Sequence, residues 1–144
     1  MTLARHLATI DLLRSRAFPA RSGRSDVGDS GPGFHTAELS TSEDFWEDRS
    51  HMDLVEEQYE AEREALAALL TGRWGEPQTV SLSSLFTRSS EGEEIPQPWD
   101  FLSACVPDVH LWRVDGRWVL LGVSKWDTEL PYQLLAVVTE TDPP

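Results

Sequence analysis

Four ionisable side chains between residues 108 and 129 are the best candidates for chemistry in this sequence. Asp108 and His110 lie two residues apart, and Asp127 and Glu129 follow in the stretch KWDTELP. Carboxylates and an imidazole act as general acids and bases when their surroundings separate their pKa values. These residues define one hypothesis, a small enzyme or ligand-binding protein. The alternative is that Asp127 caps a turn and the other three are polar surface groups, because such residues favour turns.

No motif in the sequence specifies a reaction or a cofactor. The chain contains no GxSxG, P-loop, dinucleotide-binding or HExxH string. Its four histidines have no spacing that would place two on one face of an element, and the single cysteine, Cys105, cannot form a metal-binding pair. Cys105 lies five residues before His110, a spacing that does not specify a nucleophile and its base. The alternative is that Cys105 is a small buried residue of the core. We expect no metal and no cofactor.

The charge is distributed unevenly along the chain. The net charge of the 144 residues is −13, but residues 1–25 hold five arginines against Asp11 alone, so the remaining residues carry −17. A negative surface repels nucleic-acid phosphates and anionic lipid headgroups and favours basic partners, although its commonest use is solubility. The sequence therefore predicts a protein partner with a basic or mixed basic and apolar surface, and neither nucleic acid nor membrane.

Composition also indicates where the protein works. No apolar run approaches the roughly 18 residues that span a bilayer. With a single cysteine no intramolecular disulfide can form, which favours a reducing compartment. Arginine outnumbers lysine eleven to one, a bias typical of GC-rich bacterial genomes. We expect a bacterial cytoplasmic protein.

The chain divides in sequence near residue 50. Residues 1–50 are expected to be a basic leader and a Gly/Ser-rich linker, and residues 51–144 a single α+β domain. Leu3, Leu7, Ile10 and Leu13 recur near helical spacing, which predicts a short helix unless the leader is frayed. The run RSGRSDVGDSGPG over residues 21–33 is typical of a flexible linker.

The second part contains one long helix and several strands. Residues 52–71 are rich in helix formers, with a stripe that includes Leu66, Leu69 and Leu70 and with Gly72 as the expected C-terminal cap. Alternation predicts a strand over residues 79–86, followed by a loop over 88–98. Residues 100–106 fit either irregular structure or one helical turn. Residues 132–139 favour a strand.

A hairpin over residues 109–123 is the clearest local feature. Asp115-Gly116 suits the positive φ angles of a type I′ turn, and a two-residue loop pairs Val114 with Arg117 and Trp112 with Val119. Both faces of this hairpin are apolar, so one should pack on the long helix while the rest of the chain or an external partner covers the other. The predicted fold is α+β: one long helix packed on a small, mostly antiparallel sheet of three to four strands, with a poorly ordered N-terminal segment.

Tryptophan is abundant in the second part of the chain. Trp112, Trp118 and Trp126 fall within fifteen positions. Core packing explains most such residues, but tryptophan is also enriched at binding hot spots. Together with Asp127 and Glu129, these three residues are the candidates for binding a protein partner.

Three stretches carry a resemblance to other proteins. TGRWGEP, WRVDGRWVLLGVSKWD and ELPYQLLAVV together resemble small acidic α+β proteins of high-GC bacteria with no assigned activity, over residues 66–138. The resemblance implies a compact α+β body and transfers no catalytic residue. The acidic body and the two-sided apolar hairpin favour a noncatalytic protein-binding module, immunity-like or adaptor-like. The enzyme or ligand-binding protein above, and a homo-oligomeric structural protein assembling through the 109–123 hairpin, are the alternatives.

Overall fold

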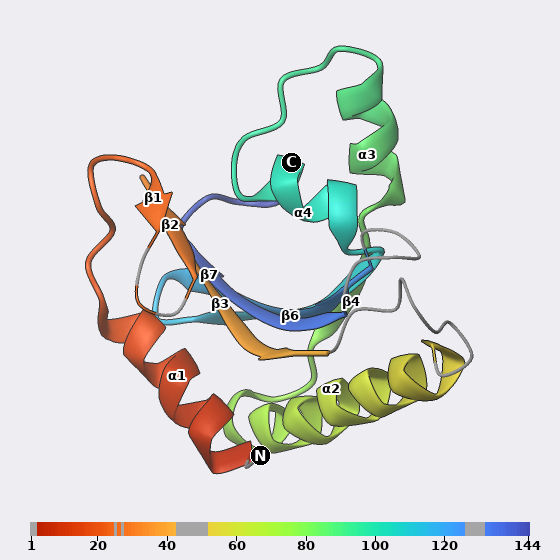
Figure 1. Cartoon of the computed structure of the whole chain (residues 1–144). Coiled ribbons are helices and arrows are strands. Elements are labelled where there is room, and N and C mark those ends of the chain that lie inside the picture. Colours follow the sequence, from red (N-terminus) through yellow and green to blue (C-terminus); the bar gives the residue numbers. More distant parts are fainter. Residues whose placement is uncertain (1–2, 25, 27, 43–51, 126–131) are drawn as a thin grey trace.

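A single antiparallel sheet runs through the middle of the molecule, between two layers of helices (Figure 1). The computed structural model describes residues 3–24, 26, 28–42, 52–125 and 132–144, and the side chains of residues 52 and 53 are not described. Helices α1 (Leu3–Ser15) and α2 (Met52–Trp74) cover one face of the sheet, and α3 (Ser83–Ser90) and α4 (Trp99–Cys105) cover the other. The strands are β1 (Gly23–Arg24), β2 (Asp29–Gly31), β3 (Phe34–Thr41), β4 (Gln78–Ser81), β5 (Asp108–Val114), β6 (Arg117–Ser124) and β7 (Gln133–Thr139). Their order across the sheet is β1-β2-β3-β7-β6-β5-β4.

The expected fold, one long helix on a sheet of three to four strands with a poorly ordered N-terminal segment, is wrong. The described residues form four helices and a seven-stranded sheet, because residues 3–41 supply α1 and three strands. The Gly- and Ser-rich run over residues 21–33 contains β1 and β2. Gly28 shows why glycine is used there: a Cβ at this position would lie 2.4 Å from the carbonyl oxygen of Thr36. In this case glycine permits close backbone packing, whereas a linker uses it for flexibility.

The predicted hairpin is confirmed as β5 and β6. Val114 pairs with Arg117 and Trp112 with Val119, and Asp115 and Gly116 have φ angles of 52° and 79°. The predicted C-terminal strand is confirmed as β7, which lies between β3 and β6. Because β4 pairs with residues 108–111 and β7 pairs with β6, the hairpin lies inside the sheet.

The long helix is also confirmed, but it ends later than expected. The N–H of Gly75 donates to the carbonyl oxygen of Thr71 at 2.8 Å, and Gly75 has a φ of 90°, the geometry of an αL cap. Gly75, not Gly72, therefore terminates α2. Leu66 and Leu70 are buried as predicted, whereas Leu69 is 42% exposed because it lies on the neighbouring side of the helix.

The strand predicted over residues 79–86 is wrong in its second half. β4 ends at Ser81 and α3 begins at Ser83. Leu82 and Leu85 are both buried. A spacing of three residues places two side chains on one side of a helix, but it also fits an imperfect alternation of apolar and polar residues in a strand. The open choice at residues 100–106 resolves as a helix, α4. None of the described helices has the length and apolar character that a membrane crossing requires.

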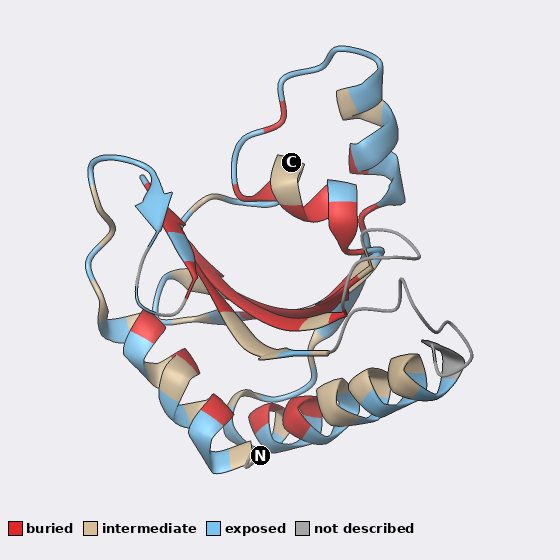
Figure 2. Ribbon diagram, viewed as in Figure 1, coloured by how far each residue is buried: buried red, intermediate tan, exposed pale blue. Residues whose placement is uncertain are grey.

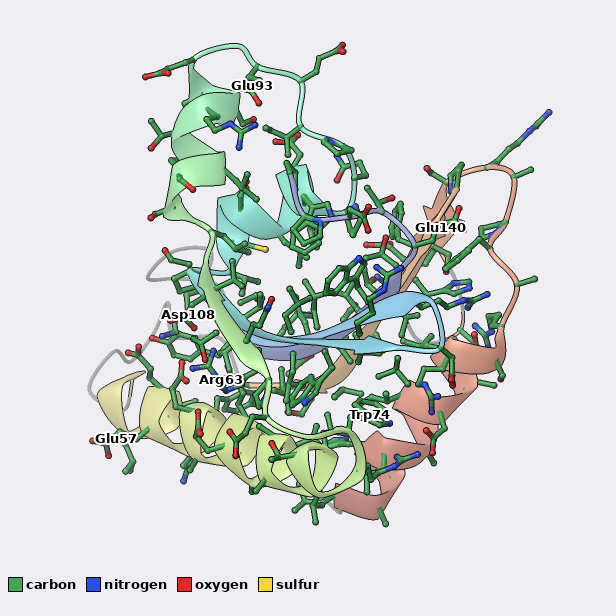
Figure 3. All side chains as sticks on the ribbon, turned by 180° about the vertical axis from the view of Figure 1, so that it is seen from behind. Glu57, Arg63, Trp74, Glu93, Asp108 and Glu140 are labelled. Carbon is green, nitrogen blue, oxygen red and sulfur yellow. The ribbon has the colours of Figure 1, made fainter. Side chains whose placement is uncertain are left out.

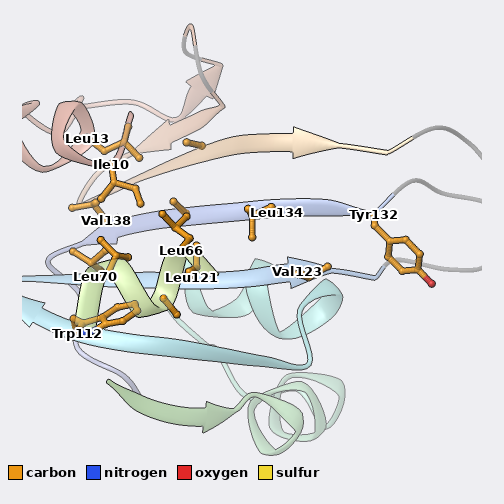
Figure 4. Packing of buried hydrophobic residues seen from close by; sticks show 14 residues of the cluster. Ile10, Leu13, Leu66, Leu70, Trp112, Leu121, Val123, Tyr132, Leu134 and Val138 are labelled. Carbon is orange, nitrogen blue, oxygen red and sulfur yellow. The ribbon is translucent and has the colours of Figure 1, made fainter. Parts of the chain in front are cut away.

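Two apolar clusters fill the spaces between the layers (Figure 2). Under α1 and α2, Ile10 and Leu13 share one cluster with Leu66, Leu70 and Trp112, so its buried contacts extend on both sides of residue 50 (Figure 4). The second cluster lies under α3 and α4. Its members include Leu82, Leu85, Trp99, Leu102, Val109, Leu111 and Leu120. The chain's own helices therefore cover both faces of the hairpin.

Candidate functional site

A row of charged side chains joins α2 to β5 and β6 and contains two of the residues selected from the sequence. We call it the α2 seam. Its members are Glu56, Glu60, Arg63, Glu64, Asp108, His110 and Lys125. The seam holds four carboxylates against one guanidinium and one ammonium, so its net charge is −2 when His110 is neutral.

Arg63 is the centre of the α2 seam. Its Nη1 lies 2.7 Å from Asp108 Oδ1 and its Nη2 lies 2.6 Å from Glu60 Oε2. Figure 3 shows Arg63 directed from α2 toward Asp108 at the start of β5. The Arg63 side chain is only 12% exposed, and its Nε has no hydrogen-bond partner within the described residues. The Asp108 carboxylate is thus engaged in holding a largely buried cation.

Lys125 extends the seam from the end of β6. Its Nζ lies 2.9 Å from a carboxylate oxygen of Glu56 and 2.9 Å from one of Glu60. Burial acts to lower the pKa of Lys125, but hydrogen bonds and attraction from the two carboxylates outweigh it and raise that pKa above its usual value. The ammonium group therefore stays charged, and it fixes the first half of α2 to the sheet.

His110 occupies the other side of the seam. Its Nε2 lies 3.2 Å from Glu64 Oε1, while its Nδ1 is buried and has no hydrogen-bond partner in the described part of the chain. Its ring packs near that of Trp112, with the ring centroids 6.1 Å apart. Because residues two apart on a strand share a face, β5 directs His110 and Asp108 toward the same helix. Asp127 and Glu129, the other two residues of the set selected from the sequence, lie outside the described residues.

The tryptophans selected from the sequence have different surroundings. Trp112 is 3% exposed, and its Nε1 donates to the carbonyl oxygen of Gly75 at 3.0 Å. Trp118 is partly buried; its Nε1 donates to Asp142 Oδ1 at 2.9 Å, and the guanidinium of Arg113 lies 4.9 Å from its ring centroid. Trp126 lies outside the described residues. Trp112 thus serves the core, whereas Trp118 lies near the surface.

Cys105 is a core residue. It is 3% exposed, and its Sγ donates to the carbonyl oxygen of Phe101 at 3.6 Å. Burial raises the pKa of the Cys105 thiol to about 12. Since the thiolate is the nucleophilic form, Cys105 is unreactive near neutral pH. The expectation of a small buried side chain is confirmed.

The side of α2 that faces away from the sheet was not selected from the sequence. We call it the α2 outer face. Its exposed residues are Leu54, Glu57, Gln58, Ala61, Ala65, Ala68 and Leu69. Leu54 is 56% and Leu69 is 42% exposed, and Glu57 makes no ion pair or hydrogen bond within the described residues. The spacing of Ala61, Ala65 and Ala68 along one helix side was the available sequence signal.

The described residues give no support for a metal site. Within the described residues no group of three or more His, Cys, Asp or Glu side chains could hold a metal ion. Comparison of the chain with protein-family models, with curated proteins and with solved structures found no match.

Proposed function

We propose that this chain is a protein-binding module of the bacterial cytoplasm, immunity-like or adaptor-like, which binds a basic protein through the α2 outer face. The observation that carries the proposal is the combination of unpaired acid and exposed leucine on one helix. Glu57 has no cationic partner in the described residues and points away from the sheet (Figure 3). Leu54 and Leu69 are two of the four large apolar side chains that the described residues expose.

The chemistry of the partner follows from this surface. Glu56 and Glu60 form ion pairs with the cations of the α2 seam, whereas Glu57 has no ion pair within the described residues. Three alanines between the leucines leave the helix surface low and flat, which suits a partner helix. A partner with Lys or Arg around an apolar anchor would complement both features. The free thiol of Cys105 supports the cytoplasmic location.

The binding surface proposed here differs from the one expected from the sequence, which lay on the hairpin. Helices α2, α3 and α4 cover the faces of β5 and β6, and Trp112 is buried. The hairpin therefore has no uncovered apolar face that would require an external partner. The α2 outer face retains exposed apolar groups after the chain has folded.

The test compares two charge reversals of equal size. Full-length wild type, Glu57→Lys and Glu94→Lys are used as baits in lysate of the source bacterium, and captured proteins are quantified by mass spectrometry. Glu94 is an exposed acid of the α3–α4 loop without an ion pair in the described residues. We expect a basic protein whose capture falls at least about tenfold with Glu57→Lys only, a loss of roughly 1.4 kcal/mol in binding.

A second pair of variants tests the apolar contribution. Leu69→Ser should reduce the same capture, whereas Phe86→Ser, which removes an exposed aromatic from α3 on the opposite face, should not. Raising the salt concentration should weaken capture, because charge attraction is screened. Capture that is equally sensitive to both charge reversals, or insensitive to Leu69→Ser, would contradict binding through the α2 outer face.

A further inference from the structure

A serine and a histidine form a close pair at the other end of the sheet from β4. Ser30 on β2 and His35 on β3 are cross-strand partners, and Ser30 Oγ lies 2.7 Å from His35 Nδ1. Both residues are buried, and both line a cavity of about 230 Å³. The pair lies outside the α2 seam and the α2 outer face.

The surroundings of His35 determine which ring nitrogen carries the proton. Nε2 lies 3.3 Å from the carbonyl oxygen of Arg16 and 3.1 Å from that of Ala17. Carbonyl oxygens only accept, so Nε2 must be the protonated nitrogen. Nδ1 is therefore the bare acceptor, and the hydroxyl of Ser30 donates to it. Burial lowers the pKa of His35, although the two carbonyl contacts oppose this, so the neutral ring is favoured.

One of the two carbonyls that orient His35 is itself held in place. Both follow the end of α1, and Arg117 Nη1 donates to the carbonyl oxygen of Arg16 at 3.0 Å and to that of Arg14, inside the helix, at 3.2 Å. The Arg117 guanidinium also lies 4.2 Å from the ring centroid of Phe18, and that ring packs against His35. A nucleophile, a base in hydrogen-bond contact and a group that orients the base are the three parts of an activated serine.

We propose that Ser30 is a nucleophile activated by His35, and that the cavity takes a small ester bearing an anionic group. Three arginines line the cavity together with the pair. Arg16 pairs with Asp26 and Arg24 with Glu38, whereas Arg21 makes no ion pair within the described residues. Arg21 is thus the cation available to a carboxylate or phosphate. The volume suits a short acyl group, since pockets for drug-sized ligands begin near 300 Å³.

The reaction proceeds by acyl transfer. Ser30 Oγ attacks the ester carbonyl carbon while its proton passes to His35 Nδ1, and the bond to the leaving alkoxide breaks as that alkoxide takes the proton. Water then attacks the Ser30 ester with the same transfers, releasing the acid and restoring the hydroxyl. Burial, together with the charges of Arg16 and Arg117, makes the intermediate imidazolium of His35 costly. We therefore expect slow turnover, and acylation itself is the better measurement.

The experiment follows covalent labelling of the full chain by a small fluorophosphonate, read as intact mass and mapped by peptide sequencing. We expect one adduct on Ser30, none with Ser30→Ala, and labelling at least about 100-fold slower with His35→Asn. Ser124→Ala, which removes a buried serine without a hydrogen-bond partner in the described residues, should label like wild type. No adduct on Ser30, or an equal rate with His35→Asn, would overturn the proposal.

The anionic preference has its own measurement. The chain should release 4-nitrophenol faster from mono-4-nitrophenyl succinate than from 4-nitrophenyl acetate, and Arg21→Ala should remove that preference. An unchanged preference with Arg21→Ala would remove Arg21 from the proposed site.

A thiol variant keeps the proposal testable if His35→Asn does not fold. Ser30→Cys places a sulfur beside His35, whereas Cys105 does not react with the reagent because burial raises its pKa. The introduced thiol should react with iodoacetamide at pH 6 about tenfold faster than that of Ser90→Cys, which is exposed and has no histidine. Equal rates would show that His35 does not activate residue 30.

Discussion

Arg63 Nη1 lies 2.7 Å from Asp108 Oδ1, and this contact joins the middle of α2 to the first residue of β5. The guanidinium is largely buried while the carboxylate is 45% exposed. The carboxylate that was selected from the sequence as a candidate acid or base therefore also helps to hold α2 on the sheet. Its loss should be visible in stability before it is visible in any activity.

Replacing Asp108 by Ala should lower the free energy of unfolding by about 1–2 kcal/mol, because among the described residues it leaves the Arg63 cation with Glu60 as its only carboxylate. Urea unfolding measures the change. Glu93→Gln, which breaks a surface pair with Arg88, is the control and should have no measurable effect. In a double-mutant cycle with Arg63→Met, additive losses would show that the contact does not stabilise the fold.

Two glycines should respond in opposite directions to alanine. At Gly122 a Cβ would lie 2.7 Å from Val106 Cγ1 and 3.2 Å from the Asp108 carbonyl oxygen, so Gly122→Ala should destabilise by about 1–3 kcal/mol. At Gly72, inside α2, a Cβ would meet nothing within 4 Å, so Gly72→Ala should stabilise by about 0.5–1 kcal/mol. Thermal unfolding of both variants measures the two changes in stability. The same sign for both would contradict this packing.

The Cys105 thiol should be unreactive until the chain unfolds. With its pKa raised to about 12 by burial, almost no thiolate is present at pH 8. Reaction with a disulfide reagent such as DTNB should be slow in buffer and fast in 6 M guanidinium chloride. The slow rate should follow the unfolding equilibrium as denaturant is added. Rapid native labelling at pH 8 would show that the thiol is exposed.

Acidification should destabilise the fold through His35. Burial lowers its pKa below the usual value near 6.5. Above that pH the ring is neutral in both the folded and the unfolded chain, so it adds no pH dependence. Below it the unfolded chain binds a proton that the folded chain does not, so the free energy of unfolding falls. Urea midpoints between pH 8 and 5 should fall less steeply for His35→Asn than for wild type, and parallel slopes would contradict this linkage.

Local signals predicted the second half of the chain better than the first. Asp115-Gly116 has the backbone preferences of one turn type, so the register of β5 and β6 followed from the sequence. The residues before 42 are rich in glycine, serine and arginine. Their structure depends on contacts with residues that are distant in the sequence. His35, for example, is buried by residues that follow α1 and by a serine across the ladder.

The candidate site shows the same limit. Asp108 and His110 were visible as ionisable groups, but their partners Arg63 and Glu64 lie more than forty residues away in sequence. The helix pattern did identify α2, yet it assigned Leu69 to the buried stripe, because leucine alone does not reveal which side of a helix faces the sheet. The Ser30–His35 pair has no sequence motif and required the structure.

The position of β7 has a consequence for synthesis of the protein. This strand, residues 133–139, lies between β3 and β6, and β3 pairs with it over nearly its whole length. During translation, β3 is made early but has only the short β2 beside it until more than ninety further residues have been added. Nascent chains stalled before residue 133 should therefore expose two unpaired strand edges, the features that invite misassembly and chaperone binding.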